Sequence, residues 1–257
     1  MGSGLFALFS AAALGALSLS HQEAMRIGRK IWQNECGGTL SGLTAWNRGE
    51  NFASLGIGHF IWYPTGARGP FEESFPQLVR YFERRGAELP ELLLRGNHAA
   101  CPWNSREQFL AASSSEKMKQ LRRFLVDTID LQADFLVERL HAALPKMLAA
   151  APPSERSRIE KQFHRVASTA QGLYALIDYV NFKGEGVLLT ERYQGRGWGL
   201  LQVLEGMSGA GEGRVATREF ADSAGRVLRD RVKNSPPARN EKQWLAGWLN
   251  RVESYRE

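Results

Sequence analysis

The stretch IWQNECGGTLSGLTAWNRGENFASLGIGHFIWY, residues 31–63, decides the fold prediction for this chain. We expect a helix to run up to Glu35, because the two glycines that follow Cys36 break it. A hairpin-like ribbon should follow and close on the sequence GIGH, residues 56–59. An acid at the end of a helix lies at the negative end of the helix dipole, which favours its protonated form. The stretch therefore predicts an acid that can give up a proton, facing a ribbon.

The ribbon brings polar groups back toward this acid. It carries Asn47, Glu50 and Ser54 between its aromatic positions. An acid that faces polar groups across a groove is the arrangement that cleavage of a glycosidic bond requires. The residues of this stretch therefore predict a carbohydrate-cleaving enzyme.

The composition is that of an ordinary globular protein. The chain has 257 residues, of which 43% are hydrophobic and 23% charged, enough for one large domain. Its net charge of +6 and pI near 9.5 favour weak association with an anionic envelope surface. It has no long basic run, so we expect no nucleic-acid partner.

The first twenty residues, MGSGLFALFSAAALGALSLS, resemble a secretory signal. An uncharged apolar run ends there in small residues, and it is short for a membrane span. We therefore expect a signal segment at 1–20 and a periplasmic or secreted protein. No basic residue precedes the run, which leaves an uncleaved anchor or a buried first helix open.

Two cysteines, Cys36 and Cys101, fit an exported protein with one disulfide. The alternative is a pair of buried free thiols. The chain has no Cys-x-x-Cys or His-x-x-x-His spacing, so we expect no metal site and no cofactor.

The rest of the chain reads as mainly helical. Ser20 and Glu23 form a capping box, Pro76 opens a second helix, and Ser105 begins a third. The sequence APPS at 151–154 breaks the chain, and one long helix should then run to about Asn181. Further helices are expected at 217–232 and 240–252, with Trp244, Leu245, Trp248 and Leu249 as core residues. The prediction is a mainly α protein with a small antiparallel sheet, forming one domain at 21–257 with a helical insertion at about 71–165.

A second informative region is DYVNFKGEGVLLTERYQGRGWGLLQVL, residues 178–204. A helix should end there, glycines flank Glu185, and a ribbon follows. Aromatic faces beside polar groups suit sugar rings. The alternative is a structural hairpin in which Glu191 pairs with an arginine. Over both ribbons the predicted substrate-binding residues are Trp46, Asn47, Glu191, Tyr193, Trp198 and Gln202.

These two regions carry a family resemblance. The helix, Glu35 and the GIGH ribbon resemble phage-type lysozymes, and GWGLLQV at 197–203 is similar to the Gly-Leu-Met-Gln signature of goose-type lysozymes and lytic transglycosylases. Both belong to the lysozyme-like superfamily, which implies hairpins lining a glycan cleft between helical lobes. The resemblance covers 31–63 and 178–204, and it implies a structural role for His59, paired with a carboxylate.

The resemblance also implies catalytic roles. Glu35 matches the general acid, and Ser54 matches the hydroxyl residue that helps hold the attacking water. The second carboxylate of the phage-type pattern is replaced by Arg48; Glu50 and Asn47 are the nearest substitutes, and Glu50 is the better base. Glu185 stands close to the position of the single acid of transglycosylases, as a rival or a partner across one cleft.

The expected substrate is peptidoglycan or a chitosan-like polymer, and the expected protein is a monomer. Three other classes stay open. One is a thiol hydrolase that uses Cys36 and His59. Another is a non-catalytic glycan-binding protein, whose sugar platform would be Trp46, Trp62, Tyr63, Tyr193 and Trp198. The third is a structural protein with these aromatic rings buried.

Overall fold

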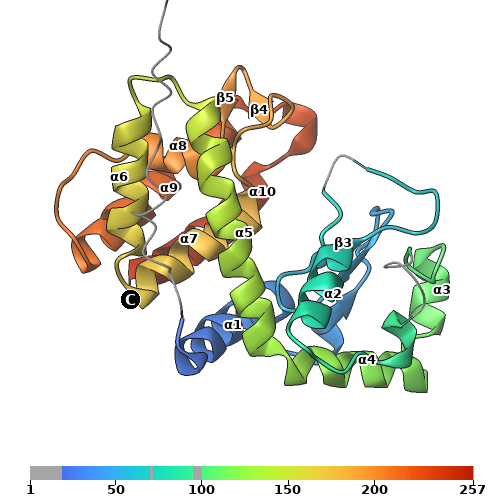
Figure 1. The fold of residues 1–257 in the computed structure, drawn as a ribbon. Helices are drawn as coiled ribbons and strands as arrows, with labels where there is room; N and C mark the ends of the chain where they lie inside the picture. Colours follow the sequence, from blue (N-terminus) through green and yellow to red (C-terminus); the bar gives the residue numbers. More distant parts are fainter. Residues whose placement is uncertain (1–18, 70–71, 95–99, 257) are drawn as a thin grey trace, which may run out of the picture.

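The computed structural model of the protein describes residues 19–69, 72–94 and 100–256 (Figure 1). In order, its helices are α1 (His21–Cys36), α2 (Phe75–Arg84), α3 (Arg106–Ala111), α4 (Glu116–Asp127), α5 (Ile129–Ala150), α6 (Arg156–Ala167), α7 (Ala170–Lys183), α8 (Leu200–Glu205), α9 (Arg214–Asn234) and α10 (Lys242–Glu253). Its strands are β1 (Thr44–Ala45), β2 (Ala53–Leu55), β3 (Phe60–Trp62), β4 (Arg192–Tyr193) and β5 (Arg196–Gly197). The predicted class, mainly α with a small antiparallel sheet, is confirmed.

Helix α1 begins and ends as its sequence predicts. The backbone N–H of Glu23 donates to the Ser20 hydroxyl at 3.3 Å, and the Glu23 carboxylate accepts from the Ser20 N–H at 3.0 Å. The helix runs one residue beyond Glu35, to Cys36, and is capped by Gly37, whose φ of +61° is a left-handed value that suits glycine. Glu35 therefore lies in the last turn of the helix.

The 31–63 ribbon is a three-stranded antiparallel sheet in the order β1-β2-β3. The GIGH turn at 56–59 joins β2 to β3, and the side chain of Gln132, on α5, hydrogen-bonds to it. The Gln132 side chain is fully buried, accepts from the Ile57 N–H at 2.9 Å and donates to Leu125 O at 2.6 Å. A Cβ at Gly56, where φ is +73°, would lie 2.4 Å from the Gln132 Oε1. Glycine at this position therefore allows α5 to approach the turn.

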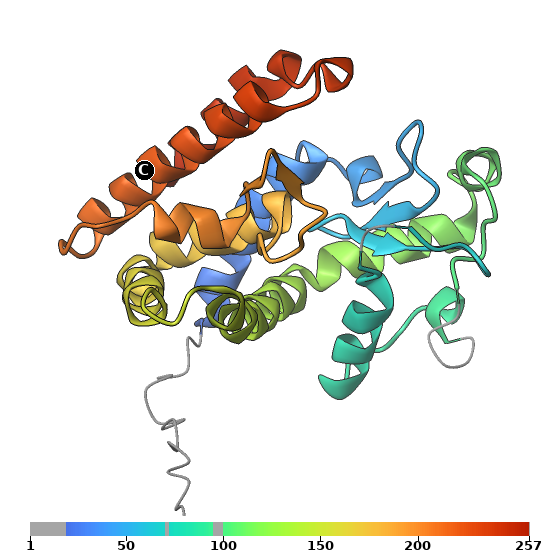
Figure 2. The same cartoon turned by 90° about the horizontal axis from the view of Figure 1, so that it is seen from above.

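Helix α5 is the central element of the fold. It extends from α4 and the sheet at one end to α6 at the other, with α1 beside it (Figure 1). Seen from above, α9 and α10 run side by side along one edge of the molecule (Figure 2). The core is continuous from the sheet through α5 to α7, α8 and α9.

The single long helix predicted after residue 154 is wrong, because the chain breaks into α6 and α7. Thr169 caps α7 by accepting from the Gly172 N–H at 3.0 Å. A Cβ at Gly172 would lie only 1.8 Å from Val166 O, so glycine allows the two helices to fold closely onto each other. The cap at Thr169 begins a new helix there, although the apolar residues keep a helical spacing across the break.

Helix α2 begins at Phe75, one residue before the predicted start, with Pro76 in its first turn. The predicted start of α3 after Ser105 and the break at 151–154 are confirmed. The prediction that Trp244, Leu245, Trp248 and Leu249 are core residues is wrong for Trp244, whereas the other three are partly buried and pack against the core. Trp244 is 47% exposed, and Trp248 is half-buried.

The disulfide proposed for Cys36 and Cys101 is not formed, because both are buried free thiols. The Cys36 thiol points to the GIGH turn and lies 3.6 Å from Gly56 O. Burial raises the pKa of each thiol to about 12. Cys36 therefore lacks the accessible thiolate that a thiol hydrolase needs.

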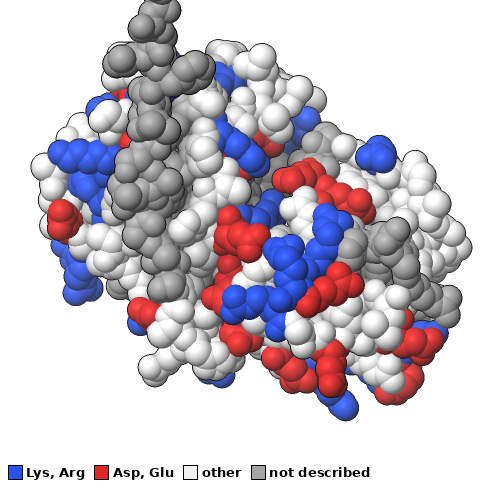
Figure 3. All heavy atoms as spheres, viewed as in Figure 1, with Lys and Arg blue, Asp and Glu red and all other residues white. Residues whose placement is uncertain are grey.

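The face drawn in Figure 3 carries basic and acidic side chains side by side. Two ion pairs connect the end of α2 with α5: Arg84 with Glu138 at 3.1 Å and Arg85 with Asp134 at 3.5 Å. Most of the predicted signal segment lies outside the described residues. Within the residues that are described, no helix is both long enough and apolar enough to cross a membrane.

Candidate active site

Glu35 is held by groups from three other parts of the chain. Its side chain is 16% exposed, and its Oε1 pairs with the Arg251 guanidinium of α10. The amide of Asn181, on α7, lies 3.4 Å from the same oxygen. His59, in the GIGH turn, places its Nδ1 4.0 Å from Oε2. The acid predicted from the sequence therefore sits where α1, α7, α10 and the sheet meet.

Arg251 serves two carboxylates at once. Its Nε and Nη2 donate to the two oxygens of Asp178, each at 2.8 Å, while Nη2 also reaches Glu35. Asp178 is fully buried and also accepts from the Tyr255 hydroxyl at 2.6 Å and from the Asn34 amide at 3.1 Å. Burial alone would lower the pKa of Arg251, but the two carboxylates raise it well above its usual value. One permanent cation therefore fixes the geometry of the cluster.

His59 occupies a strained backbone position, with φ of +48°. Its Nε2 lies 3.1 Å from Gly42 O, and the Asn181 amide bridges to the same turn by donating to Gly58 O at 3.2 Å. The carboxylate expected as the partner of His59 is Glu35 itself. The GIGH turn therefore contacts the candidate acid directly.

Lys183, at the end of α7, adds an unusual amine to this cluster. Its Nζ lies 3.5 Å from the centre of the Trp248 ring and 3.9 Å from that of Phe182. Burial, reinforced by the charge of Arg231, lowers the pKa of Lys183 to about 6. At neutral pH this lysine is therefore mostly an uncharged amine.

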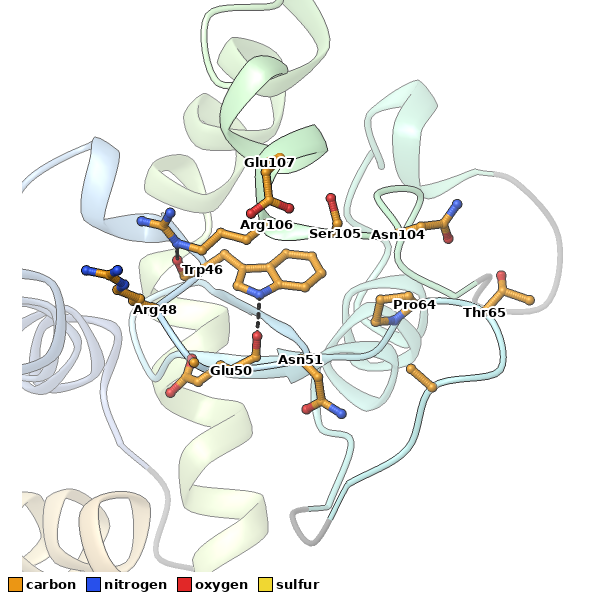
Figure 4. Close-up of a pocket in the computed structure, with 12 residues that line it drawn as sticks. Trp46, Arg48, Glu50, Asn51, Pro64, Thr65, Asn104, Ser105, Arg106 and Glu107 are labelled. Atoms are coloured by element: carbon orange, nitrogen blue, oxygen red, sulfur yellow. Dashed lines mark hydrogen bonds between the residues drawn. The ribbon is translucent and has the colours of Figure 1, made fainter. Parts of the chain in front are cut away.

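Glu50 lies in the loop between β1 (Thr44–Ala45) and β2 (Ala53–Leu55). It lines a pocket of about 880 Å³ with Trp46, Arg48 and Arg106 at one end and Thr65 and Asn104 at the other (Figure 4). One carboxylate oxygen of Glu50, Oε2, is buried and has no hydrogen-bond partner among the residues that the structure describes. Glu35 is not among the residues that line this pocket.

The other residues predicted on the first ribbon have mixed positions. Ser54 is buried on β2, opposite Ala45 and Ile61, whereas Asn47 is exposed in the loop. Trp46 is 5% exposed, and its indole N–H donates to Glu50 O at 2.8 Å. Trp62 and Tyr63 are buried as well, so the first ribbon does not present the sugar platform of the glycan-binding alternative.

Glu185 forms a separate acidic site. Its carboxylate pairs with Lys146 of α5 at 2.9 Å, and its side chain is partly exposed. Glu191 lies nearby, where burial and the charge of Glu185 raise its pKa. Glu185 and Glu35 thus have different cationic partners.

The remaining predicted residues of the second ribbon are engaged in internal contacts. The Gln202 side chain accepts from the Gly199 N–H at 3.0 Å and donates to Gly186 O at 3.1 Å, which ties β5 and α8 to the loop after α7. The Tyr193 hydroxyl donates to Glu241 at 2.9 Å. Trp198 is buried, with the Arg231 guanidinium over its ring. The ribbon forms the predicted hairpin β4–β5, but most of its polar groups hold the fold.

Sequence reasoning missed Arg251, Asp178 and Lys183 as members of the site. The only available signal was that Asp178 and Asn181 stand one helical turn apart before the glycines of the second region. Within the described residues, no group of three or more His, Cys, Asp or Glu side chains is arranged to hold a metal ion.

Comparisons of the chain with protein-family models, with curated proteins and with solved structures gave no match.

Proposed function

We propose that this protein is a glycoside-cleaving enzyme that acts on peptidoglycan or a related aminosugar polymer. Its general acid is Glu35. The observation that carries the proposal is the environment of this carboxyl: a partly exposed acid at a helix end, clamped by Arg251 and Asn181 and faced by His59. An acid held in one orientation but open to solvent can meet a substrate.

The clamp suits proton transfer to a leaving sugar oxygen. When Glu35 gives up its proton, a carboxylate forms, and the Arg251 guanidinium and the Asn181 amide are already placed to stabilise that charge. Asp178 takes most of the hydrogen bonds of Arg251, so the cation is shared rather than dedicated to Glu35.

Water is proposed to be placed by Glu50 and Ser54, on the hairpin that follows α1. An inverting enzyme needs two carboxyl groups about 6.5–9.5 Å apart, with water between them. Glu50 is the candidate base because its Oε2 has no hydrogen-bond partner among the described residues. In this proposal the fold is lysozyme-like, with the two hairpins lining one glycan cleft, and the protein acts as a periplasmic or secreted monomer.

A lytic transglycosylase that uses Glu185 is the second candidate. It is favoured by the closeness of the loop after α7 to the start of α8, where a Cβ at Gly199 would lie 2.1 Å from Gly186 N. This close approach fixes the backbone beside Glu185, and the transglycosylase reaction needs only one acid. A non-catalytic glycan-binding protein is the third candidate and predicts binding without products.

Digestion of purified peptidoglycan and of chitosan oligomers, read by mass spectrometry, separates these candidates. The Glu35 hydrolase predicts reducing-end products that disappear in Glu35→Gln and persist in Glu185→Gln. Anhydro-sugar products that are lost only in Glu185→Gln would instead establish the transglycosylase. Well-folded wild type that releases no products would contradict both enzymes.

A further inference from the structure

The last helix presents aromatic rings on the same face as the arginine that holds Glu35. Trp244, Trp248 and Arg251 are spaced by four and three residues along α10, so at 100° per residue Trp244 and Arg251 lie within about 20° of each other. Trp244, Trp248 and Arg251 thus form a row along one face of α10. Arg251 contacts Glu35 at one end of this row, and Trp244 is 47% exposed at the other.

Contacts connect the row without a gap. The Trp244 and Trp248 rings have centroids 6.1 Å apart and are inclined by 35°. Trp248 packs its face on the Lys183 amine at 3.5 Å and lies 6.3 Å from Phe182. The Phe182 ring in turn lies 4.2 Å from the Arg251 guanidinium carbon. Trp248 is therefore fixed by its neighbours, and it fixes the inner side of Trp244.

Trp244 is exposed beside the Trp248 ring, at the edge of the cluster that holds Glu35. Isolated exposed apolar residues need no explanation, but here two indoles adjoin, and they lead to a candidate acid. Rigid aromatic rings bind ligands at low cost in side-chain entropy. Pyranose rings have an apolar face that stacks on indole, while their hydroxyls find polar partners.

We propose that Trp244 and Trp248 form a sugar-binding subsite that leads a hexosamine chain to Glu35. Seven residues of helix separate Trp244 from Arg251, a rise of about 10 Å, which leaves room for more than one sugar ring. The subsite rests on the proposed function, since the direction of the chain is defined by the acid at its end. It assigns a binding role to α10, whose aromatic residues the sequence suggested were core.

The test measures binding separately from cleavage. Isothermal titration calorimetry with N-acetylated chitotetraose would be run on the Glu35→Gln protein, alone and with Trp244→Ala or Trp244→Phe. The matched control is Val215→Ala, which truncates an apolar side chain that is 60% exposed on α9. We expect Trp244→Ala to raise Kd about three- to tenfold, whereas Trp244→Phe and Val215→Ala stay within about twofold of the parent.

The outcomes separate the subsite from the enzyme. Unchanged binding by Trp244→Ala, or no binding by the parent protein at millimolar sugar, overturns the subsite. Cleavage by wild type would leave the proposed function standing in either case. Weaker binding by Trp244→Ala in a protein that cleaves no polymer supports the subsite and overturns general-acid catalysis by Glu35.

Discussion

Replacing Arg251 by methionine should destabilise the protein strongly, because it leaves Asp178 charged and buried. Methionine keeps the length of the side chain but removes both 2.8 Å hydrogen bonds to Asp178. The remaining donors are neutral, the Tyr255 hydroxyl and the Asn34 amide. Removing one partner of a buried ion pair lowers the free energy of unfolding by about 3–5 kcal/mol. For a chain of this size that corresponds to a fall in Tm of roughly 10 °C.

The same geometry predicts that a second substitution will rescue the first. Asp178→Asn removes the buried charge, so Arg251→Met combined with Asp178→Asn should recover about 2 kcal/mol or more of the loss. The matched control is Arg256→Met, whose guanidinium is 30% exposed and pairs with Asp222 and Glu253 at the surface. That substitution should cost at most about 1 kcal/mol.

Urea unfolding at neutral pH, followed by circular dichroism, measures wild type, Arg251→Met, Asp178→Asn, the double variant and the Arg256→Met control. A loss below about 1 kcal/mol for Arg251→Met would refute the dependence of buried Asp178 on this one cation. If the loss in the double variant equals the sum of the losses in the two single variants, the Arg251 and Asp178 side chains do not interact, and the same dependence is refuted.

Three further predictions follow from other buried groups. Lys183 has a folded-state pKa of about 6 against about 10.4 unfolded, so between these values the unfolded chain binds more protons. The free energy of unfolding should therefore rise with pH, by at most about 1.4 kcal/mol per pH unit. Lys183→Met should be more stable than wild type at pH 7 and should show a smaller rise between pH 7 and pH 9 in urea unfolding. An unchanged rise in the variant would contradict the burial of the Lys183 amine. Gln132→Leu should cost about 2 kcal/mol or more by stranding the buried Ile57 N–H, and calorimetry that finds a neutral effect would contradict this bridge. Cys36 and Cys101 should titrate as two free thiols with Ellman's reagent in denaturant and react slowly in the native protein, since burial raises their pKa to about 12; fast native reaction would contradict their burial.

Local signals in the sequence predicted local structure well. The Ser20 capping box and the two glycines after Cys36 fix α1 through contacts only a few residues apart. The GIGH turn was likewise predictable, because glycines there permit backbone conformations that other residues avoid. These signals placed Glu35 at a helix end before any tertiary contact was known.

The partners of Glu35 could not be predicted in this way. Arg251 lies 216 residues further along the chain, and nothing in its own segment distinguishes it from the other arginines of the last helices. Packing between distant segments also decides that Cys36 and Cys101 stay free thiols and that Trp244 is exposed. Cysteine count and helical periodicity predict that a residue is buried or paired, but not which neighbour it meets.

Turnover by Glu35→Gln tests the central claim most directly. Purified wild type and Glu35→Gln, each shown to be folded by circular dichroism, would be compared for the release of reducing ends from peptidoglycan. A general acid contributes about 10²- to 10⁴-fold to the rate, so the variant should lose at least about 100-fold in kcat. Activity within about tenfold of wild type would contradict the assignment of Glu35 as the catalytic acid.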